Sequence, residues 1–179
     1  MRFIKRFALI IALLVLLVPG GVATAQSNND YLDLVRTRCE ATKQLVDQQR
    51  RSDLVARINK GRAYQIIIDQ QNAFSLRLRN NKVSADTFDH EQAAVQEGVN
   101  SFRAAYDRYD DSMASLLSID CKSKPQDFAQ QLVVARSLRQ IIGNVVADTD
   151  TELARYRQDV TNFKQEIDRL GGKVTGAAQ

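Results

Sequence analysis

The chain of 179 residues carries 25 basic and 21 acidic side chains, two cysteines, two prolines and no tryptophan. Three of the basic residues and none of the acidic ones precede Gln26, so the rest of the chain carries 22 basic against 21 acidic side chains. A nucleic-acid-binding domain needs a basic face to neutralise phosphates, so this near-zero balance excludes nucleic acid as an expected partner. No long stretch alternates apolar with polar residues, which excludes a β-sandwich or barrel.

Residues 1–25 have the layout of a secretory signal: a basic start, an apolar run over residues 7–18 and small residues at the end. The pattern predicts cleavage between Ala25 and Gln26. The alternative is an uncleaved membrane anchor, because residues 7–25 are uncharged and nearly long enough to span a bilayer. Either way the remainder is predicted to be extracytoplasmic: secreted, periplasmic or at the cell surface. Membrane contact is expected only through residues 7–25, if they are retained.

A first long helix is predicted over residues 30–79, followed by a turn at residues 80–84. Apolar residues recur at helical spacing near both of its ends, but residues 47–53 are seven consecutive polar residues. This polar run is either a solvated part of one helix or a break near residues 50–53, which would give a four-helix bundle instead of a three-helix one. If the helix is continuous, we expect the run to bury little apolar area, to be the least stable part of the bundle, and to be a place where a partner could bind.

A second helix is predicted over residues 86–118. Five apolar residues follow one another at intervals of seven, and three more lie four residues after members of that series. This is an a/d seam of four heptads. The two sets are Phe88, Val95, Phe102, Tyr109 and Leu116, and Val99, Tyr106 and Met113.

A third helix is predicted from Pro125, which suits a first helical turn, to Leu170. Two seven-residue series run through it, and only Thr149 and Arg139 interrupt their apolar character. Arg139 either reaches solvent or meets an acidic residue of the 86–118 helix. Gly171 and Gly172 are expected to end the helix, so the bundle domain is predicted to cover residues 26–170 and a flexible tail residues 171–179.

Cys39 and Cys121 are predicted to form a disulfide, because an even cysteine count in an exported chain favours one. With one helix over residues 30–79, an antiparallel return places Cys121 close to Cys39. A chain folded back at residues 50–53 would instead separate the two by roughly 30 Å at helical rise, too far for a bond. A disulfide therefore implies an elongated, antiparallel, coiled-coil-like bundle of three helices running up, down and up.

The charges of the first two helices are opposite. Residues 30–82 carry 11 basic and 6 acidic side chains, whereas residues 83–120 carry 2 and 8. We expect these two strips to pair within one chain, although pairing between chains would use the same complementarity.

No residue pattern points to catalysis, a cofactor or a metal. The single histidine, His90, neighbours Asp86, Asp89 and Glu91, but an acidic first helical turn explains this cluster more simply than a zinc site with closed geometry. No serine or cysteine is placed beside that histidine by its sequence context, so no nucleophile is expected.

These features predict a non-enzymatic secreted or surface-tethered helical protein with an interaction or structural role, acting through its helix faces on a protein partner or on itself. The alternative is an extracytoplasmic bundle that binds a small apolar ligand or a metal between its helices.

Overall fold

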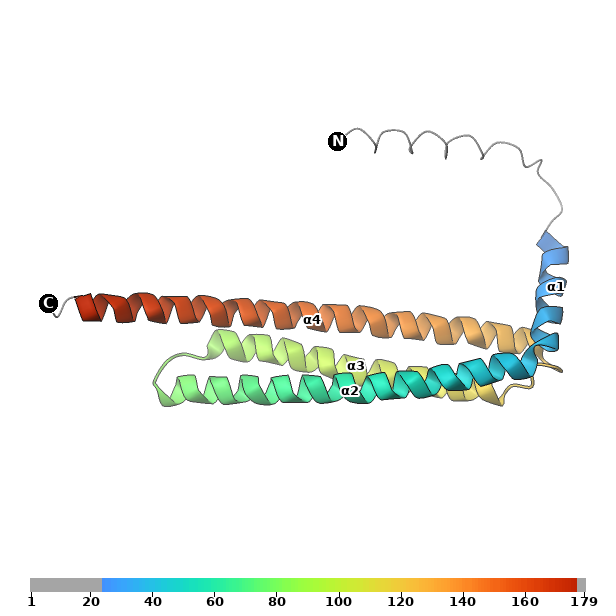
Figure 1. Cartoon of the computed structure of the whole chain (residues 1–179), viewed down its shortest axis with the longest axis horizontal. Coiled ribbons are helices and arrows are strands. Elements are labelled where there is room, and N and C mark those ends of the chain that lie inside the picture. Colours follow the sequence, from blue (N-terminus) through green and yellow to red (C-terminus); the bar gives the residue numbers. More distant parts are fainter. Residues whose placement is uncertain (1–23, 177–179) are drawn as a thin grey trace, which may run out of the picture.

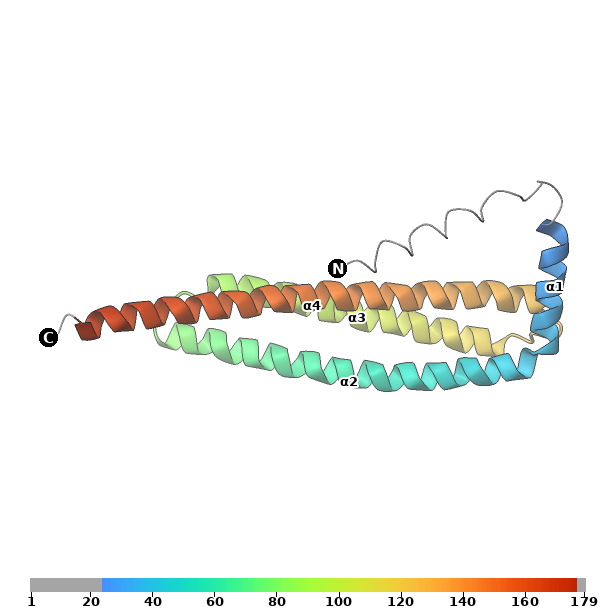
Figure 2. The same ribbon diagram turned by 45° about the horizontal axis from the view of Figure 1, so that its top comes forward.

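The computed structural model describes the backbone of residues 24–176 and the side chains of residues 29–170. This part of the chain forms four helices: α1 (Thr24–Thr37), α2 (Cys39–Asn80), α3 (Asp86–Ser118) and α4 (Pro125–Gly176). The three long helices lie side by side in an up-down-up bundle, and α1 crosses the end where α2 and α4 begin (Figures 1 and 2). The predicted all-α bundle of three long helices is thus confirmed. Residues 1–23 of the predicted signal segment and residues 177–179 of the predicted tail lie outside the described residues.

The prediction of a single helix over residues 30–79 is wrong at its start. The helix breaks at Arg38, and the preceding residues form α1, which turns away from the direction of α2 across the end of the bundle (Figure 1). No glycine or proline causes this break. Cys39 is instead fixed by its disulfide, and the turn lets Val35 of α1 pack against the core at the end of the bundle. A straight continuation would carry Val35 beyond the bundle and leave it in solvent.

The alternative break near residues 50–53 is also wrong, because α2 is continuous through them. The polar run was expected to bury little apolar area; four of its seven residues are exposed, and the one that is buried, Asp53, is polar and 7% exposed. The four-helix alternative therefore fails, and the fourth helix that is present arises at Arg38 instead.

The boundaries of α3 and the start of α4 agree with the prediction, whereas the predicted end of α4 is wrong. The helix continues through Gly171 and Gly172 to Gly176. A glycine costs a helix interior about 1 kcal/mol relative to alanine, which weakens a helix without stopping it. Helix α4 also extends beyond α2 and α3: it continues past the turn that joins them (Figure 1), and every residue from 164 to 170 is exposed.

The turn between α2 and α3 ends α2 with a Schellman motif. The Val83 N–H donates to the Leu78 carbonyl at 2.9 Å, and the Lys82 N–H donates to the Arg79 carbonyl at 2.9 Å. Lys82 takes the left-handed conformation that this motif requires, with φ of 60°. The predicted turn at residues 80–84 is therefore present.

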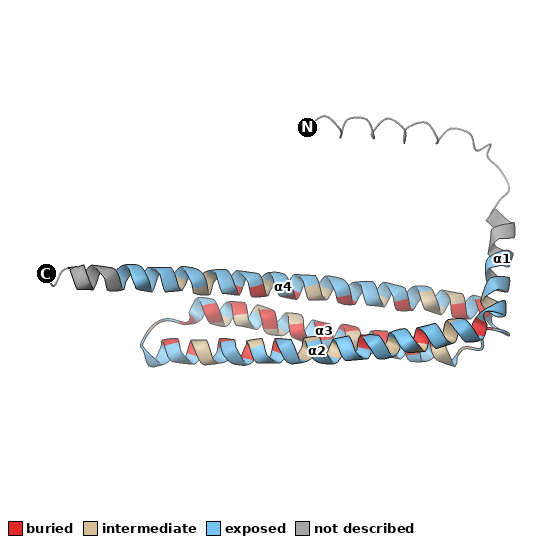
Figure 3. Ribbon diagram, viewed as in Figure 1, coloured by how far each residue is buried: buried red, intermediate tan, exposed pale blue. Residues whose placement is uncertain are grey.

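The core follows the predicted heptad series, and buried residues line the sides of the helices that face one another (Figure 3). One cluster extends from the disulfide to Leu153, and a second surrounds Phe88 near the α2–α3 turn. Phe88 meets Phe74, Tyr156 and Phe163 edge to face, with ring centroids 5.0, 5.9 and 5.7 Å apart. Such pairs add to the stability that burial itself supplies.

Ion pairs join α2 to α3. This agrees with the prediction that the basic strip of residues 30–82 and the acidic strip of residues 83–120 pair within one chain. Basic residues of α2 reach acidic residues of α3 at three heights along the bundle. Because exposed ion pairs contribute only ~0–1 kcal/mol each, they set register more than stability. The pairs are Arg50–Asp110, Arg57–Asp107 and Arg79–Asp89.

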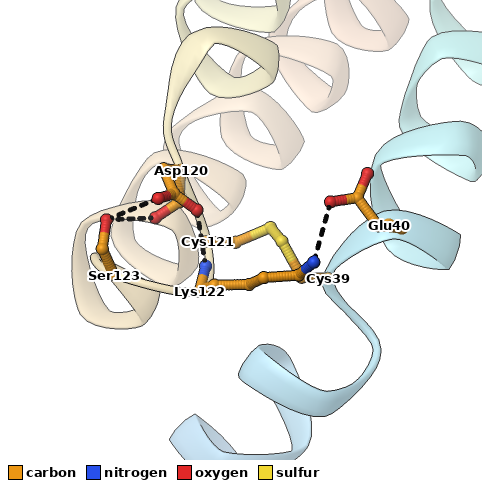
Figure 4. The surroundings of a disulfide bond; sticks show 6 residues. All are labelled: Cys39, Glu40, Asp120, Cys121, Lys122 and Ser123. Atoms are coloured by element: carbon orange, nitrogen blue, oxygen red, sulfur yellow. Dashed lines mark hydrogen bonds and ion pairs between the residues drawn. A yellow bond between two sulfur atoms is a disulfide. The ribbon is translucent and has the colours of Figure 1, made fainter.

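The predicted disulfide joins Cys39, at the start of α2, to Cys121, in the loop before α4 (Figure 4). Their Cα atoms are 5.5 Å apart, and both residues are almost completely buried. The Lys122 ammonium beside them lies 3.4 Å from the Glu40 carboxylate, so the loop is also held to α2 by charge. Across residues 24–176, none of the helices carries an apolar stretch long enough to cross a bilayer.

Candidate functional site

An open groove runs along the bundle between α2 and α4. Both helices pack on α3, but nowhere in the described part of the chain does a Cα atom of α2 come within 8 Å of one of α4. Side chains bridge the two helices, through two ion pairs and, near the α2–α3 turn, through the edge-to-face contact of Phe74 with Phe163. The three long helices therefore form a trough with α3 at its base, and the fourth corner of a four-helix arrangement is left open.

The groove contains three hollows in a row. The first, about 340 Å³, lies near the disulfide end and has Leu45 and Val46 on one wall, Leu132 and Ala135 on the other, and Met113 at its base. The second and third, about 300 and 240 Å³, adjoin each other further along and share Ile67, Leu153 and Arg157. Their row indicates an elongated site whose first and third hollows are mainly apolar and whose middle hollow is lined equally by polar and apolar groups.

A buried carboxylate bridges the groove beside the first hollow. Arg139 of α4 donates to both oxygens of Asp53, at 3.0 Å from Nε and 3.2 Å from Nη2. The Tyr109 hydroxyl donates to the same carboxylate at 2.6 Å, and the Gln49 amide at 2.9 Å. Burial alone would raise the pKa of Asp53, but the hydrogen bonds from Arg139 and Tyr109 outweigh it, so the pKa is lowered. Asp53 is therefore a paired anion that fixes the distance between α2 and α4.

A second bridge lies at the middle hollow. The Lys60 ammonium contacts the Asp150 carboxylate at 2.8 and 3.0 Å, and the hydroxyl of buried Tyr64 donates to Asp150 at 3.2 Å. The ammonium also lies 4.9 Å from the centroid of the Tyr64 ring, within cation–π range. Both carboxylates that bridge the groove are thus already neutralised by basic partners.

The charges left over in the groove are basic. Arg136 lines the first hollow and Arg157 the other two, and neither forms an ion pair with any side chain among residues 29–170. Gln71, at the third hollow, is 2% exposed, and both polar atoms of its amide lack a hydrogen-bond partner in the described region. The groove therefore offers apolar walls, two free guanidinium groups and an unpartnered amide.

The other residues considered from sequence lie apart from this groove. The disulfide sits at the end of the bundle near the first hollow, and His90 is exposed on α3. Ala25 and Gln26, the predicted cleavage site, belong to the backbone of α1. Within the part whose side chains are described, no three histidine, cysteine, aspartate or glutamate residues are grouped as metal ligands.

Sequence reasoning missed the role of Asp53 and named the wrong helix for the acidic partner of Arg139. Arg139 was expected either to reach solvent or to meet an acidic residue of the 86–118 helix; its side chain is 56% exposed, and its ion-pair partner lies on α2. A signal was present, because Asp53 follows Cys39 and Val46 at intervals of seven and all three are buried. The seven-residue polar run obscured this series.

No protein-family model, no curated protein and no solved structure matches this chain.

Proposed function

We propose that this protein is a non-enzymatic, extracytoplasmic interaction protein that holds an amphipathic helix of a partner protein in the groove between α2 and α4. The observation that carries the proposal is the row of three hollows of about 340, 300 and 240 Å³ between two helices whose Cα atoms stay more than 8 Å apart. A helix laid into such a groove buries its apolar face and completes a four-helix arrangement.

The unpaired basic residues of the groove favour a partner helix that carries acidic residues on its flanks. Arg136 lies at the first hollow and Arg157 where the second and third adjoin, and neither has an acidic partner within the described region. Carboxylates on the bound helix would pair with them, whereas a basic helix would be repelled. Such complementarity affects specificity and association rate more than affinity.

The disulfide supports the extracytoplasmic location. Disulfides persist in oxidising compartments and are rare in reducing ones, and here the bond is buried at the end of the bundle where α1 crosses it. The predicted signal segment at residues 1–25 supports the same location.

The proposal is tested with synthetic peptides. An amphipathic peptide of about 20 residues, roughly 30 Å as a helix, is made with leucines on one face and glutamates along its flanks; a second version carries lysines instead. We expect the disulfide-bonded protein, taken from the secreted fraction, to bind the acidic peptide at least ten-fold more tightly in fluorescence anisotropy. The Arg136→Glu/Arg157→Glu variant should reverse this preference.

A matched pair of variants locates the binding site. Leu45, 66% exposed, lines the first hollow, whereas Val133, 62% exposed, lines none of the three. Leu45→Gln should weaken peptide binding several-fold and Val133→Gln should leave it unchanged. Binding of neither peptide, or equal effects of the two substitutions, would refute the groove as the site.

A second candidate is favoured by the size of the first hollow. Its volume of about 340 Å³ falls within the range of small-molecule sites, and its walls are mainly apolar. Native mass spectrometry of the purified protein tests this function. A co-purifying small apolar molecule, lost on Leu45→Gln, would support it over the peptide-binding function.

A further inference from the structure

The outer face of α2 carries an apolar stripe that no helix of the bundle covers. Val55, Ile58, Ile66 and Leu76 are each between 44% and 58% exposed. The residues of α2 that bind α3 (Arg50, Arg57 and Arg79) and the residue that binds α4 (Lys60) lie on other faces of the helix. The stripe therefore faces mainly away from the rest of the bundle, and only Leu76 among these four also lines a hollow against α3.

Seven residues make up this outer stripe, and consecutive members are three or four positions apart, so they share one face of the helix. Five are apolar, one is basic and one is acidic. They are Val55, Ile58, Arg62, Ile66, Asp69, Ala73 and Leu76. The stripe spans 22 residues, or about 33 Å at helical rise.

The stripe is complementary to itself when two copies run in opposite directions. If a two-fold axis passes between positions 65 and 66, Val55 of one copy lies opposite Leu76 of the other, and Ile58 lies opposite Ala73. Ile66 then lies beside the axis in both copies. Each apolar residue of the stripe meets the apolar part of the second copy, as an isologous interface requires.

The two charges fit the same pairing. Arg62 lies opposite Asp69 of the second copy, and the symmetry repeats the pair. Within the chain, Arg62 has no ion pair among the described side chains, and Asp69 only accepts a hydrogen bond from the Gln65 amide at 3.1 Å. A parallel pairing in register would instead place Arg62 against Arg62 and Asp69 against Asp69. The charges therefore select the antiparallel arrangement.

From this geometry we infer that the outer stripe of α2 is the interface of a two-fold symmetric, antiparallel dimer of this chain. None of the seven residues lines the groove between α2 and α4. The dimer leaves that groove free for a partner, and the two proposals stand or fall separately.

Charge exchange tests the inference. Sedimentation velocity of the disulfide-bonded protein should show a concentration-dependent monomer–dimer equilibrium. Asp69→Arg places two arginines opposite each other, and Arg62→Asp places two aspartates opposite each other, so each should weaken dimerisation at least ten-fold. An equimolar mixture of the two variants pairs unlike charges at both sites, so it should dimerise as the wild type does.

The control is Asp168→Arg, an equal charge change at an exposed position near the end of α4, which should leave dimerisation unchanged. Circular dichroism checks that each variant keeps its helices. A wild-type protein that stays monomeric at every concentration would overturn the inference. Dimerisation that survives both single substitutions, or a mixture that fails to associate, would overturn it as well.

Discussion

The carboxyl group of Glu91 lies on the inner side of α3, where burial is unfavourable for its charged form. It is 6% exposed, and its Oε2 has no hydrogen-bond partner in the described region. Burial, together with the nearby Asp159 carboxyl of α4, raises the pKa of Glu91 to about 7; Glu152 adds to this and the Arg155 guanidinium opposes it. The folded protein therefore holds a proton here at pH values where an unfolded chain has already released it.

This raised pKa makes stability depend on pH. Between the ordinary glutamate pKa of about 4.3 and about 7, the folded state binds more protons than the unfolded state, so stability falls as pH rises through this window. Glu91→Gln removes the charge, so the variant should be about 1–3 kcal/mol more stable than the wild type at pH 8 and nearly equal at pH 4.5. Urea denaturation at both values measures this, with Glu97→Gln at an exposed site of the same helix as the control. Equal pH slopes in wild type and Glu91→Gln would contradict it.

At the scale of elements, the heptad pattern predicted the helix bounds that depend on local periodicity. It missed the helix break and the groove, which depend on tertiary contacts. The bounds of α3 and the start of α4 follow from acidic residues and a proline at the first turns of strong apolar seams. The break at Arg38 has no local signal, because the disulfide and the packing of Val35 at the bundle end create it. The groove was equally hidden, because the distance between α2 and α4 is set by the bridges Asp53–Arg139 and Lys60–Asp150.

The close packing of α3 on α4 depends on Gly98. A Cβ atom at this position would lie 2.5 Å from the Oγ1 atom of buried Thr149 and 3.2 Å from its Cβ. Gly98→Ala should therefore destabilise the fold by about 1–3 kcal/mol, even though alanine favours a helix. Gly143, on α4, has nothing within 4 Å of its added Cβ, so Gly143→Ala should stabilise the fold by about 0.5–1 kcal/mol. Thermal denaturation compares the two, and Thr149→Ala should partly rescue Gly98→Ala; equal signs for both glycines would refute the packing argument.

At the scale of the whole molecule, the two ends of the bundle are closed by different means. At one end, the Schellman turn joins α2 to α3 and the aromatic cluster around Phe88 ties both to α4. At the other end, α2 and the loop before α4 are far apart in the chain, and the disulfide joins them across a sequence separation of 82 residues. The groove's first hollow lies at this disulfide end, so its shape depends on the bond.

Removing the disulfide should therefore loosen one end of the molecule first. In the chain-entropy model, a bond that closes a loop of this length stabilises a fold by about 4–5 kcal/mol, so Cys39→Ala/Cys121→Ala should lower the melting temperature clearly. Amide hydrogen exchange should speed up in the first turns of α2, residues 39–46, and much less over residues 64–78, where the Tyr64–Phe102 and Phe74–Phe88 contacts remain. Reducing agent should reproduce both effects in the wild type and change nothing in the double variant. An unchanged melting temperature, or exchange that rises equally in both windows, would show that the bundle end holds without the bond.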